Sequence, residues 1–364
     1  MKSLLVFHPL VAPYRLDLFN KFSSDFDTTI CLTESQWEGN MFEGLENQYA
    51  FKPKYLTGNL GLLRVGKAIQ ILKKIRPNVV IVSECGILSI LITIYCKLFF
   101  RSCRVVELLD DSYDMISYDH HFSAKHKWSE RLLLPMVDQI ICVEPRVADC
   151  FKEKYGKGFF FPIIRDERLL RAQIPSFKNE ASIYNETYGT KGNTVFLFVG
   201  RLVALKNVAK LIKAFLSANM DNALLVIVGD GEERDNLMKE AGGDARVVFT
   251  GRLEGESLYA WYDVADVFIL PSYQESFGAV TNEALIMGCY CLVSNLAGSS
   301  CLIEKDVNGS TFDPYDTNAL SDLLLQYNYK VERDTQGCKT CLMTRSFNEY
   351  YVDLVSSIGL GVNS

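Results

Sequence analysis

Residues 194–218, TVFLFVGRLVALKNVAKLIKAFLSA, pass directly from a continuous apolar run into a helical pattern. An uninterrupted run of Val, Phe and Leu is typical of a parallel strand that is buried on both faces. The apolar residues after Asn207 recur at helical spacing, and a short loop that begins at Gly200 separates the two patterns. The stretch therefore predicts one strand–loop–helix unit of a doubly wound α/β sheet.

The same alternation runs along the chain, stops in the polar stretch 165–193, and then starts again. It predicts two Rossmann-like doubly wound α/β domains that face each other across a cleft, with a linker in that polar stretch. We place one domain at residues 1–172, a second at 173–342, and a C-terminal helix, 343–364, that packs back on the first domain. Strands are expected at 3–7, 28–32, 79–83, 104–108 and 139–143, and again at 195–199, 223–228, 246–250, 266–270 and 289–294.

Composition excludes several classes of protein. Of 364 residues, 48% are hydrophobic and 23% charged, which fits two globular domains and excludes wholesale disorder or a fibrous repeat. The net charge of −6 argues against nucleic acid as a partner. The balance is nonetheless uneven, because residues 1–180 are basic and the remainder is acidic. The basic half could contact an anionic membrane, and chance drift in composition is the alternative.

Cysteine usage and hydropathy indicate a cytoplasmic protein. The eleven cysteines are scattered, and several lie within apolar strands, as free thiols do in a reducing compartment. The longest apolar stretch without charge, 85–96, is shorter than the roughly 20 residues of a membrane span. No secretory signal is recognisable after Met1. We expect a cytoplasmic chain with peripheral contact at the inner face of the plasma membrane.

Three loops that follow predicted strands carry candidate binding residues, because ligands of open α/β sheets bind beyond the carboxyl ends of the strands. The loop from Gly200 to Asn207 contains Arg201 and Lys206, two cations suited to a diphosphate, unless both are solvated surface charges. The loop at Gly229 is either a tight turn or a place where backbone approaches a ligand.

The third loop lies in LPSYQESFGAVTNEALIMG, residues 270–288. A helix beginning near Gly278 would offer free N–H groups and a positive dipole end to a phosphate, with Ser276 as a candidate cap. Glu283 lies in an apolar sequence, where a carboxylate needs a partner such as a sugar hydroxyl. The alternative is a glutamate exposed on the polar face of that helix.

These segments resemble glycosyltransferase family 4, retaining enzymes of the GT-B fold. Glu275-x7-Glu283 resembles the E-x7-E signature of that family, and FVGRLVALKN resembles its Gly-Arg-Leu-x3-Lys element. The similarity is dense over residues 194–316 and thin in the front half. There, the segment from Pro13 to Phe19 resembles polysaccharide-building members.

The resemblance implies roles for individual residues. Arg201 and Lys206 would hold the donor diphosphate, Glu275 would contact the donor sugar and Glu283 the ribose. Further contacts to the donor would come from Gly200, Gly229, Arg252, Leu253, Phe277, Gly278, Ala279 and Val280. Cations and a helix dipole can stabilise a departing diphosphate without a metal, so neither metal nor cofactor is expected.

The front half departs from the family pattern. The family carries a His at the end of a strand in this domain, and residues 107–114, ELLDDSYD, stand there instead. Asp110, which we take as a catalytic candidate, or Asp111 would replace it. His8, just beyond the first strand, is a candidate on the acceptor side.

The function expected from these observations is retaining transfer of a sugar from a nucleotide-diphosphate donor to a glycan or lipid-linked acceptor in surface polysaccharide synthesis. A UDP-sugar is the first choice of donor and a GDP-sugar the second. The alternatives are a non-catalytic nucleotide-sugar-binding protein and an epimerase or phosphorylase of the same fold. A nicotinamide oxidoreductase is disfavoured because the first strand lacks G-x-G-x-x-G.

Overall fold

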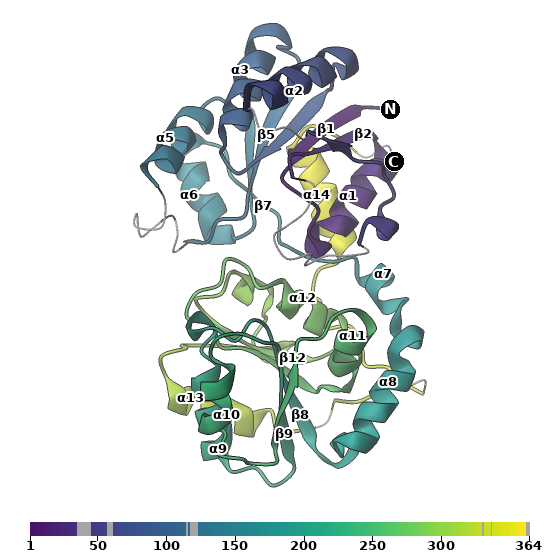
Figure 1. Ribbon diagram of the computed structural model, residues 1–364, viewed down its shortest axis with the longest axis vertical. Coiled ribbons are helices and arrows are strands. Elements are labelled where there is room, and N and C mark those ends of the chain that lie inside the picture. The colour runs from purple at the N-terminus through teal and green to yellow at the C-terminus, as the bar shows by residue number, and fades with distance from the viewer. Residues whose placement is uncertain are drawn as a thin grey trace. The chain divides into compact units, whose positions relative to one another are not determined.

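The computed structural model describes residues 1–34, 45–56, 61–113, 116, 123–329, 331–335 and 337–361. The chain forms two compact units. Unit 1 comprises Met1–Ile163 and Phe347–Ser364, and unit 2 comprises Ile164–Ser346. Each unit contains one parallel sheet with helices on its faces (Figure 1). This is the two-domain α/β fold expected from the alternation of strands and helices.

The sheet of unit 1 has seven parallel strands in the order β3-β2-β1-β4-β5-β6-β7. β1 pairs with both β2 and β4, so the direction of winding reverses between β1 and β4. The short edge strands β3 and β7 were not predicted, since two residues carry no periodicity. The strands are β1 (Ser3–His8), β2 (Asp27–Leu32), β3 (Lys54–Tyr55), β4 (Val79–Ser83), β5 (Arg104–Leu109), β6 (Gln139–Cys142) and β7 (Phe159–Phe160).

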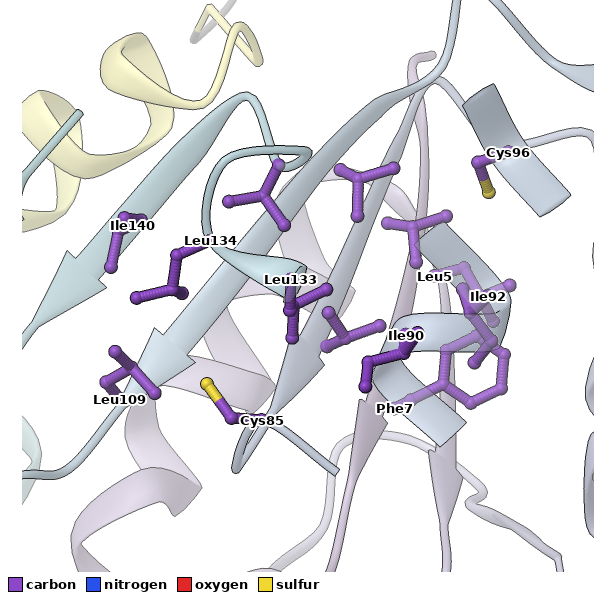
Figure 2. Packing of buried hydrophobic residues seen from close by; sticks show 14 of the residues in the cluster. Leu5, Phe7, Cys85, Ile90, Ile92, Cys96, Leu109, Leu133, Leu134 and Ile140 are labelled. Carbon is purple, nitrogen blue, oxygen red and sulfur yellow. The ribbon is translucent and has the colours of Figure 1, made fainter. Parts of the chain in front are cut away.

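Helices cover both faces of this sheet. On one face, α2 contacts α3 and α3 contacts α5. The apolar side chains between them and the sheet form a continuous buried cluster, and Figure 2 shows Leu5 and Phe7 of β1 beside Ile90 and Ile92 of α3. The helices of unit 1 are α1 (Pro13–Asp25), α2 (Gly61–Ile75), α3 (Ile87–Phe99), α5 (Ala124–Leu133), α6 (Pro145–Tyr155) and α14 (Phe347–Ser357).

The C-terminal helix α14 belongs to unit 1. It lies beside α1, where Tyr351 packs against Phe22 with ring centroids 5.8 Å apart (Figure 1). The Phe160 and Tyr350 rings meet edge to face at 6.1 Å. Segments more than 300 residues apart in the sequence are thus neighbours in one core.

The sheet of unit 2 has six parallel strands in the order β10-β9-β8-β11-β12-β13. Its core consists of apolar side chains from the sheet and from α9, α10 and α13. The strands are β8 (Thr194–Val199), β9 (Ala223–Val228), β10 (Val247–Gly251), β11 (Val267–Leu270), β12 (Tyr290–Ser294) and β13 (Gly309–Phe312). The helices are α7 (Glu167–Arg171), α8 (Ile174–Thr187), α9 (Val208–Ala218), α10 (Arg234–Glu240), α11 (Gly255–Val264), α12 (Ala279–Ile286) and α13 (Thr317–Gln326).

The prediction of a linker at 165–193 is wrong, because most of this stretch is helical. α8 packs on α11, with Tyr184 stacked on Trp261 at 4.5 Å and Lys178 Nζ 3.0 Å from an Asp263 oxygen. The boundary expected after residue 172 therefore lies earlier, at Ile164. Arg171 donates to the carbonyls of Ile286 and Lys339, which attaches α7 to unit 2. Most residues of α8 are polar, so the few buried ones did not show a helical spacing in the sequence.

Candidate functional site

The candidate site of unit 2 lies where its sheet changes winding direction. The chain proceeds outward from β8 to β9 and β10, then returns to the other side of β8 as β11. The loops after β8 and β11 therefore diverge at the carboxyl edge, which is the usual place for a ligand in an open α/β sheet. Lys206 follows β8 and Glu275 follows β11. The topology thus places two of the predicted site residues on the two loops that flank this switch point.

Lys206 and Glu275 form an ion pair between the Lys Nζ and Glu Oε2 atoms. Each side chain is 17% exposed, so both groups are largely withdrawn from water but still reachable. An ion pair with this exposure is screened less than one at the surface. The sequence identified both residues as candidates but gave no indication that they contact each other across 69 positions.

The backbone around Lys206 is tied to the loop after β11. Lys206 ends a 3-10 turn, Ala204–Lys206, and Asn207 follows in the left-handed conformation at φ 58°. The buried Asn207 amide donates to the carbonyls of Pro271 and Pro314 at 3.0 and 3.1 Å. The Tyr273 N–H also donates to the Leu205 carbonyl at 2.9 Å. These bonds hold the cation loop and the carboxylate loop in one arrangement.

The glycines at the end of β9 serve close backbone packing. A Cβ at Gly229 would lie 1.9 Å from the Gly200 carbonyl oxygen, and one at Gly231 would lie 2.5 Å from the Leu202 oxygen. The Leu202 N–H donates to the Asp230 carbonyl at 2.9 Å. The structure therefore gives these glycines a tight-turn role, which was one of the two interpretations left open.

Gly278 begins α12 in a conformation that favours glycine, with φ 89°. It occupies the N-cap position, so the expectation that Ser276 caps this helix is wrong. The loop before α12 pairs with the chain after β12. The Gly298 and Ser299 N–H groups donate to the Glu275 and Phe277 carbonyls at 3.1 and 2.7 Å. These hydrogen bonds hold the loop directly before α12. Ala279 and Val280, the first residues of the helix, are partly exposed.

Glu283 lies inside a polar network and not on an exposed helix face. Its side chain is 15% exposed, and Oε1 is 3.9 Å from Arg165 Nη1 and 3.4 Å from the Tyr259 hydroxyl. Arg165 also donates to Tyr259 at 3.2 Å, and its backbone N–H donates to Asn282 Oδ1 at 2.8 Å. Burial and the nearby Glu283 carboxylate raise the pKa of Tyr259, so the phenol stays protonated and donates.

Arg165 and Tyr259 were missed by sequence reasoning. Arg165 was placed in the supposed linker, and Tyr259 lies on α11 and was given no role at the site. A partial signal was available, because a carboxylate within the apolar stretch after residue 278 requires a partner. Sequence spacing cannot identify that partner, since the two residues lie 118 and 24 positions away from Glu283.

The remaining predicted residues of unit 2 are more exposed or act through the backbone. Arg201 is exposed at the end of β8. Arg252 is also exposed and pairs with Glu254, while Leu253 beside it is half-buried. Phe277 is buried, at 2% exposure, so its side chain contributes packing and only its backbone is available to a ligand.

The equivalent switch point of unit 1 holds a cavity of about 230 Å³ between the ends of β1 and β4. His8 lines it and contacts the Leu10 carbonyl through Nδ1 at 2.6 Å. Because a carbonyl can only accept, Nδ1 carries the proton and Nε2 is an acceptor. Burial and the Arg15 guanidinium lower the pKa of His8 to about 4, which keeps the imidazole neutral near pH 7. Besides His8, the lining includes Thr33, Arg64, Ser83, Glu84 and Ile87.

Asp110, at the end of β5, pairs with the buried guanidinium of Arg15. Asp111 beside it is largely buried, and burial together with the Asp110 charge raises the pKa of Asp111 to about 7. Glu107 lies within β5, three residues before Asp110. It is fully buried, and burial raises its pKa to about 8. Asp110 is therefore the partner of a cation, while the raised pKa values of Asp111 and Glu107 mean that these two carboxyls hold protons more readily.

Among the described residues, no group of three or more His, Cys, Asp or Glu side chains is placed to hold a metal ion. Asp114, part of the segment expected to replace the family's His, lies outside the described residues. None of the eleven cysteines, all of which lie within the described residues, takes part in a disulfide.

The fold and the paired charges at the sheet edge define a two-domain α/β protein of the GT-B type. Residues 184–329 match the family model described as glycosyl transferases group 1. The match covers most of unit 2 and confirms the resemblance found in the motifs.

Curated relatives support an enzyme of the glycosyltransferase type. The chain is 28% identical over 209 residues to the UDP-Gal:alpha-D-GlcNAc-diphosphoundecaprenol alpha-1,3-galactosyltransferase of Escherichia coli, covering 55% of this chain and 54% of that protein. It is 40% identical over 141 residues to the GDP-mannose-dependent alpha-mannosyltransferase of Corynebacterium glutamicum, covering 39% and 33%. The chain spans between about a third and a half of the length of these relatives.

Solved structures share the fold over nearly the whole chain. HepE of Anabaena in complex with UDP aligns with a TM-score of 0.69 and 18% identity, covering 98% of this chain and 96% of the other. The lipopolysaccharide outer core galactosyltransferase WaaB aligns with a TM-score of 0.67 and 16% identity, covering 99% of both chains. At these identities the likeness defines the fold alone. Among the described residues, no helix is long and apolar enough to span a membrane.

Proposed function

We propose that this protein is a retaining glycosyltransferase that moves a sugar from a nucleotide-diphosphate donor bound by unit 2 to a glycan or lipid-linked acceptor. The Lys206–Glu275 pair at the switch point of the sheet is the observation that carries this proposal. It sets a cation and a carboxylate side by side, which are the two groups that a diphosphate and a sugar hydroxyl require.

The proposed chemistry depends on charge stabilisation. Cleavage of the donor leaves negative charge on the departing diphosphate, which the Lys206 ammonium and the exposed Arg201 would neutralise. The N-terminal end of α12, behind Gly278, would add the positive end of its dipole. Glu275 would hold the donor sugar, and Glu283, fixed by Arg165 and Tyr259, would accept hydrogen bonds from the ribose. We propose that these groups suffice without a metal.

The donor and acceptor classes are proposed from the relatives. The printed names include a UDP-galactose enzyme that uses a diphosphoundecaprenol acceptor and a GDP-mannose enzyme. Anabaena HepE was solved with UDP. These favour a UDP-sugar as donor, a GDP-sugar second, and a lipid-linked or growing surface glycan as acceptor.

Thermal unfolding with nucleotides tests the donor proposal. We expect millimolar UDP to raise the melting temperature of the full chain, with GDP next and ADP and NAD without effect. A ligand at ~100 times its dissociation constant stabilises by roughly 2.7 kcal/mol, which is readily measured. Lys206→Ala should reduce the UDP shift, whereas the matched exposed cation Lys191→Ala should not. A shift with NAD alone would contradict the proposal.

Retention of anomeric configuration needs a separate measurement. Once a donor has been identified, NMR of the first product should show the anomeric configuration of the donor. An inverted product would contradict the retaining mechanism while leaving glycosyl transfer intact.

A further inference from the structure

We infer that one face of unit 1 is a docking surface for an anionic phospholipid bilayer. The face is formed by α2, α3 and α5, which follow one another along one side of the sheet (Figure 1). Each of these helices returns the chain to the start of the next strand, so their C-terminal ends share the amino edge of the sheet. We define the docking face by four apolar residues, Leu98, Phe99, Trp128 and Leu132, and four cations, Lys73, Lys74, Arg101 and Arg131.

The apolar part of the docking face is exposed to water. Phe99 is 65% exposed, Leu98 61%, Trp128 60% and Leu132 37%. Leu98 and Phe99 end α3, and Trp128 and Leu132 lie one turn apart on the adjoining α5. Large side chains scattered singly over a surface are ordinary, whereas four on two helices that pack together favour an interaction site.

The charges on the docking face select the partner. Residues 61–104, which include α2 and α3, carry eight Lys or Arg and a single acidic residue, Glu84. Lys73 and Lys74 are exposed in the last turn of α2, and Arg101 is exposed just after α3. Cations near an anionic leaflet are attracted within about one Debye length, ~8 Å at physiological salt.

The cations and the aromatic residues belong to one surface. Lys73 Nζ lies 6.0 Å from the centre of the Tyr95 ring, and Tyr95 packs against Phe99 with centroids 4.8 Å apart. The contact thus runs from α2 to the exposed end of α3. An aromatic ring flanked by Lys and Arg is suited to a membrane interface, where the ring enters the headgroup region and the cations meet phosphates.

An anionic bilayer is favoured over a second copy of the chain. The whole molecule has a formal charge of −6, but the docking face itself is positively charged. If two copies met through this face, their Lys and Arg side chains would repel each other. The bilayer complements both the cations and the apolar residues. Docking of this kind is peripheral, because it needs no membrane-spanning helix.

Vesicle flotation of the full chain tests the inference. We expect binding to phosphatidylcholine vesicles containing about a third phosphatidylglycerol, little binding to pure phosphatidylcholine, and loss of binding as salt rises to about 0.5 M. K73E/K74E and F99A/W128A should each lower the apparent partition coefficient at least tenfold. The control I183A/K191E changes one exposed apolar residue and one exposed cation of unit 2 and should bind as wild type does.

Several results would overturn the inference. Equal binding to neutral and anionic vesicles, no binding to either, or variants that bind like wild type would each do so. Light scattering that finds a wild-type dimer dissociated by F99A/W128A would assign the face to a second copy. The UDP-induced shift in melting temperature, measured on the same variants, should not change. A failure of docking is thereby distinguished from a failure of donor binding.

Discussion

The switch points of the two sheets differ in how their charges are arranged. In unit 2, two carboxylates, Glu275 and Glu283, each contact a cation, and the loops around them are joined by backbone hydrogen bonds. In unit 1, the corresponding place is a cavity lined by the neutral His8 together with Arg64 and Glu84, and burial raises the pKa of the Glu84 carboxyl. The charges of unit 2 contact each other in pairs, which suits a ligand with fixed charges, whereas the cavity of unit 1 offers a neutral imidazole acceptor, which suits uncharged hydroxyls.

The difference also explains which half resembles the family. Diphosphate and ribose are common to all nucleotide sugars, so the residues proposed to bind them are constrained to one chemistry. Residues that meet an acceptor must differ with that acceptor. The match to the family model at 184–329, which lies within unit 2, agrees with this division.

The largest effect should come from breaking the charge pair of unit 2. Lys206→Ala and Glu275→Ala should each lower turnover at least tenfold, and loss of one charge-stabilising group typically costs about 100-fold. Product formation would be measured at saturating donor, with circular dichroism to verify folding. Unchanged turnover in folded Glu275→Ala would refute its role at the donor sugar.

A smaller effect should follow from removing the partners of Glu283. Arg165→Met and Tyr259→Phe should each weaken UDP binding by about tenfold or more, because a hydrogen bond to a charged group contributes about 1.5–3 kcal/mol. Calorimetric titration would measure the dissociation constant. Arg165→Lys is the control and should retain part of the affinity. If both variants bound UDP as wild type does, the network would be structural and not part of the site.

The buried carboxyl of Glu107 should make unit 1 less stable at alkaline pH. Its pKa rises from 4.5 to about 8 in the folded state, so the folded chain holds a proton that the unfolded chain releases in this window. Stability is therefore present at low pH and falls as pH rises toward 8. Calorimetry at pH 6 to 8 should show this fall, and Glu107→Gln, which cannot ionise, should reduce it.

His8 acts in the opposite direction at lower pH. Its folded pKa of about 4 lies below the ordinary 6.5, so the unfolded chain binds the extra proton between these values. Stability from this group accordingly rises with pH up to about 6.5, and above that value only the carboxyls act. A wild-type unit 1 that gains stability from pH 6.5 to 8 would contradict the assignment of Glu107 and Asp111.

The smallest effect is expected at Arg252. Its ion pair with Glu254 joins side chains that are 54% and 63% exposed, and such pairs contribute about 0–1 kcal/mol. Arg252→Ala should leave the melting temperature nearly unchanged and alter UDP affinity less than about threefold. Glu254→Ala is the matched control. A large loss of affinity in Arg252→Ala alone would show that the nucleotide takes this cation from Glu254.

Local pattern was sufficient for most of the strands and helices. The apolar runs at β8 and β9 and the helical spacing of α9 occur where the sequence predicts them, because a strand buried on both faces needs continuous apolar residues. The pattern failed at β3 and β7, which are too short, and at α8, whose buried Ile174, Phe177 and Ala181 are diluted by polar residues.

The sequence by itself determined the doubly wound architecture, the family of unit 2, and the loops that hold Lys206, Glu275 and Glu283. These follow from local periodicity and from residues close together in the chain. Only the tertiary structure decided that Lys206 contacts Glu275, that Arg165 and Tyr259 hold Glu283, and that Arg15 holds Asp110. The physical reason is that each contact joins loops or helices brought together by strand order, which no spacing in the sequence records.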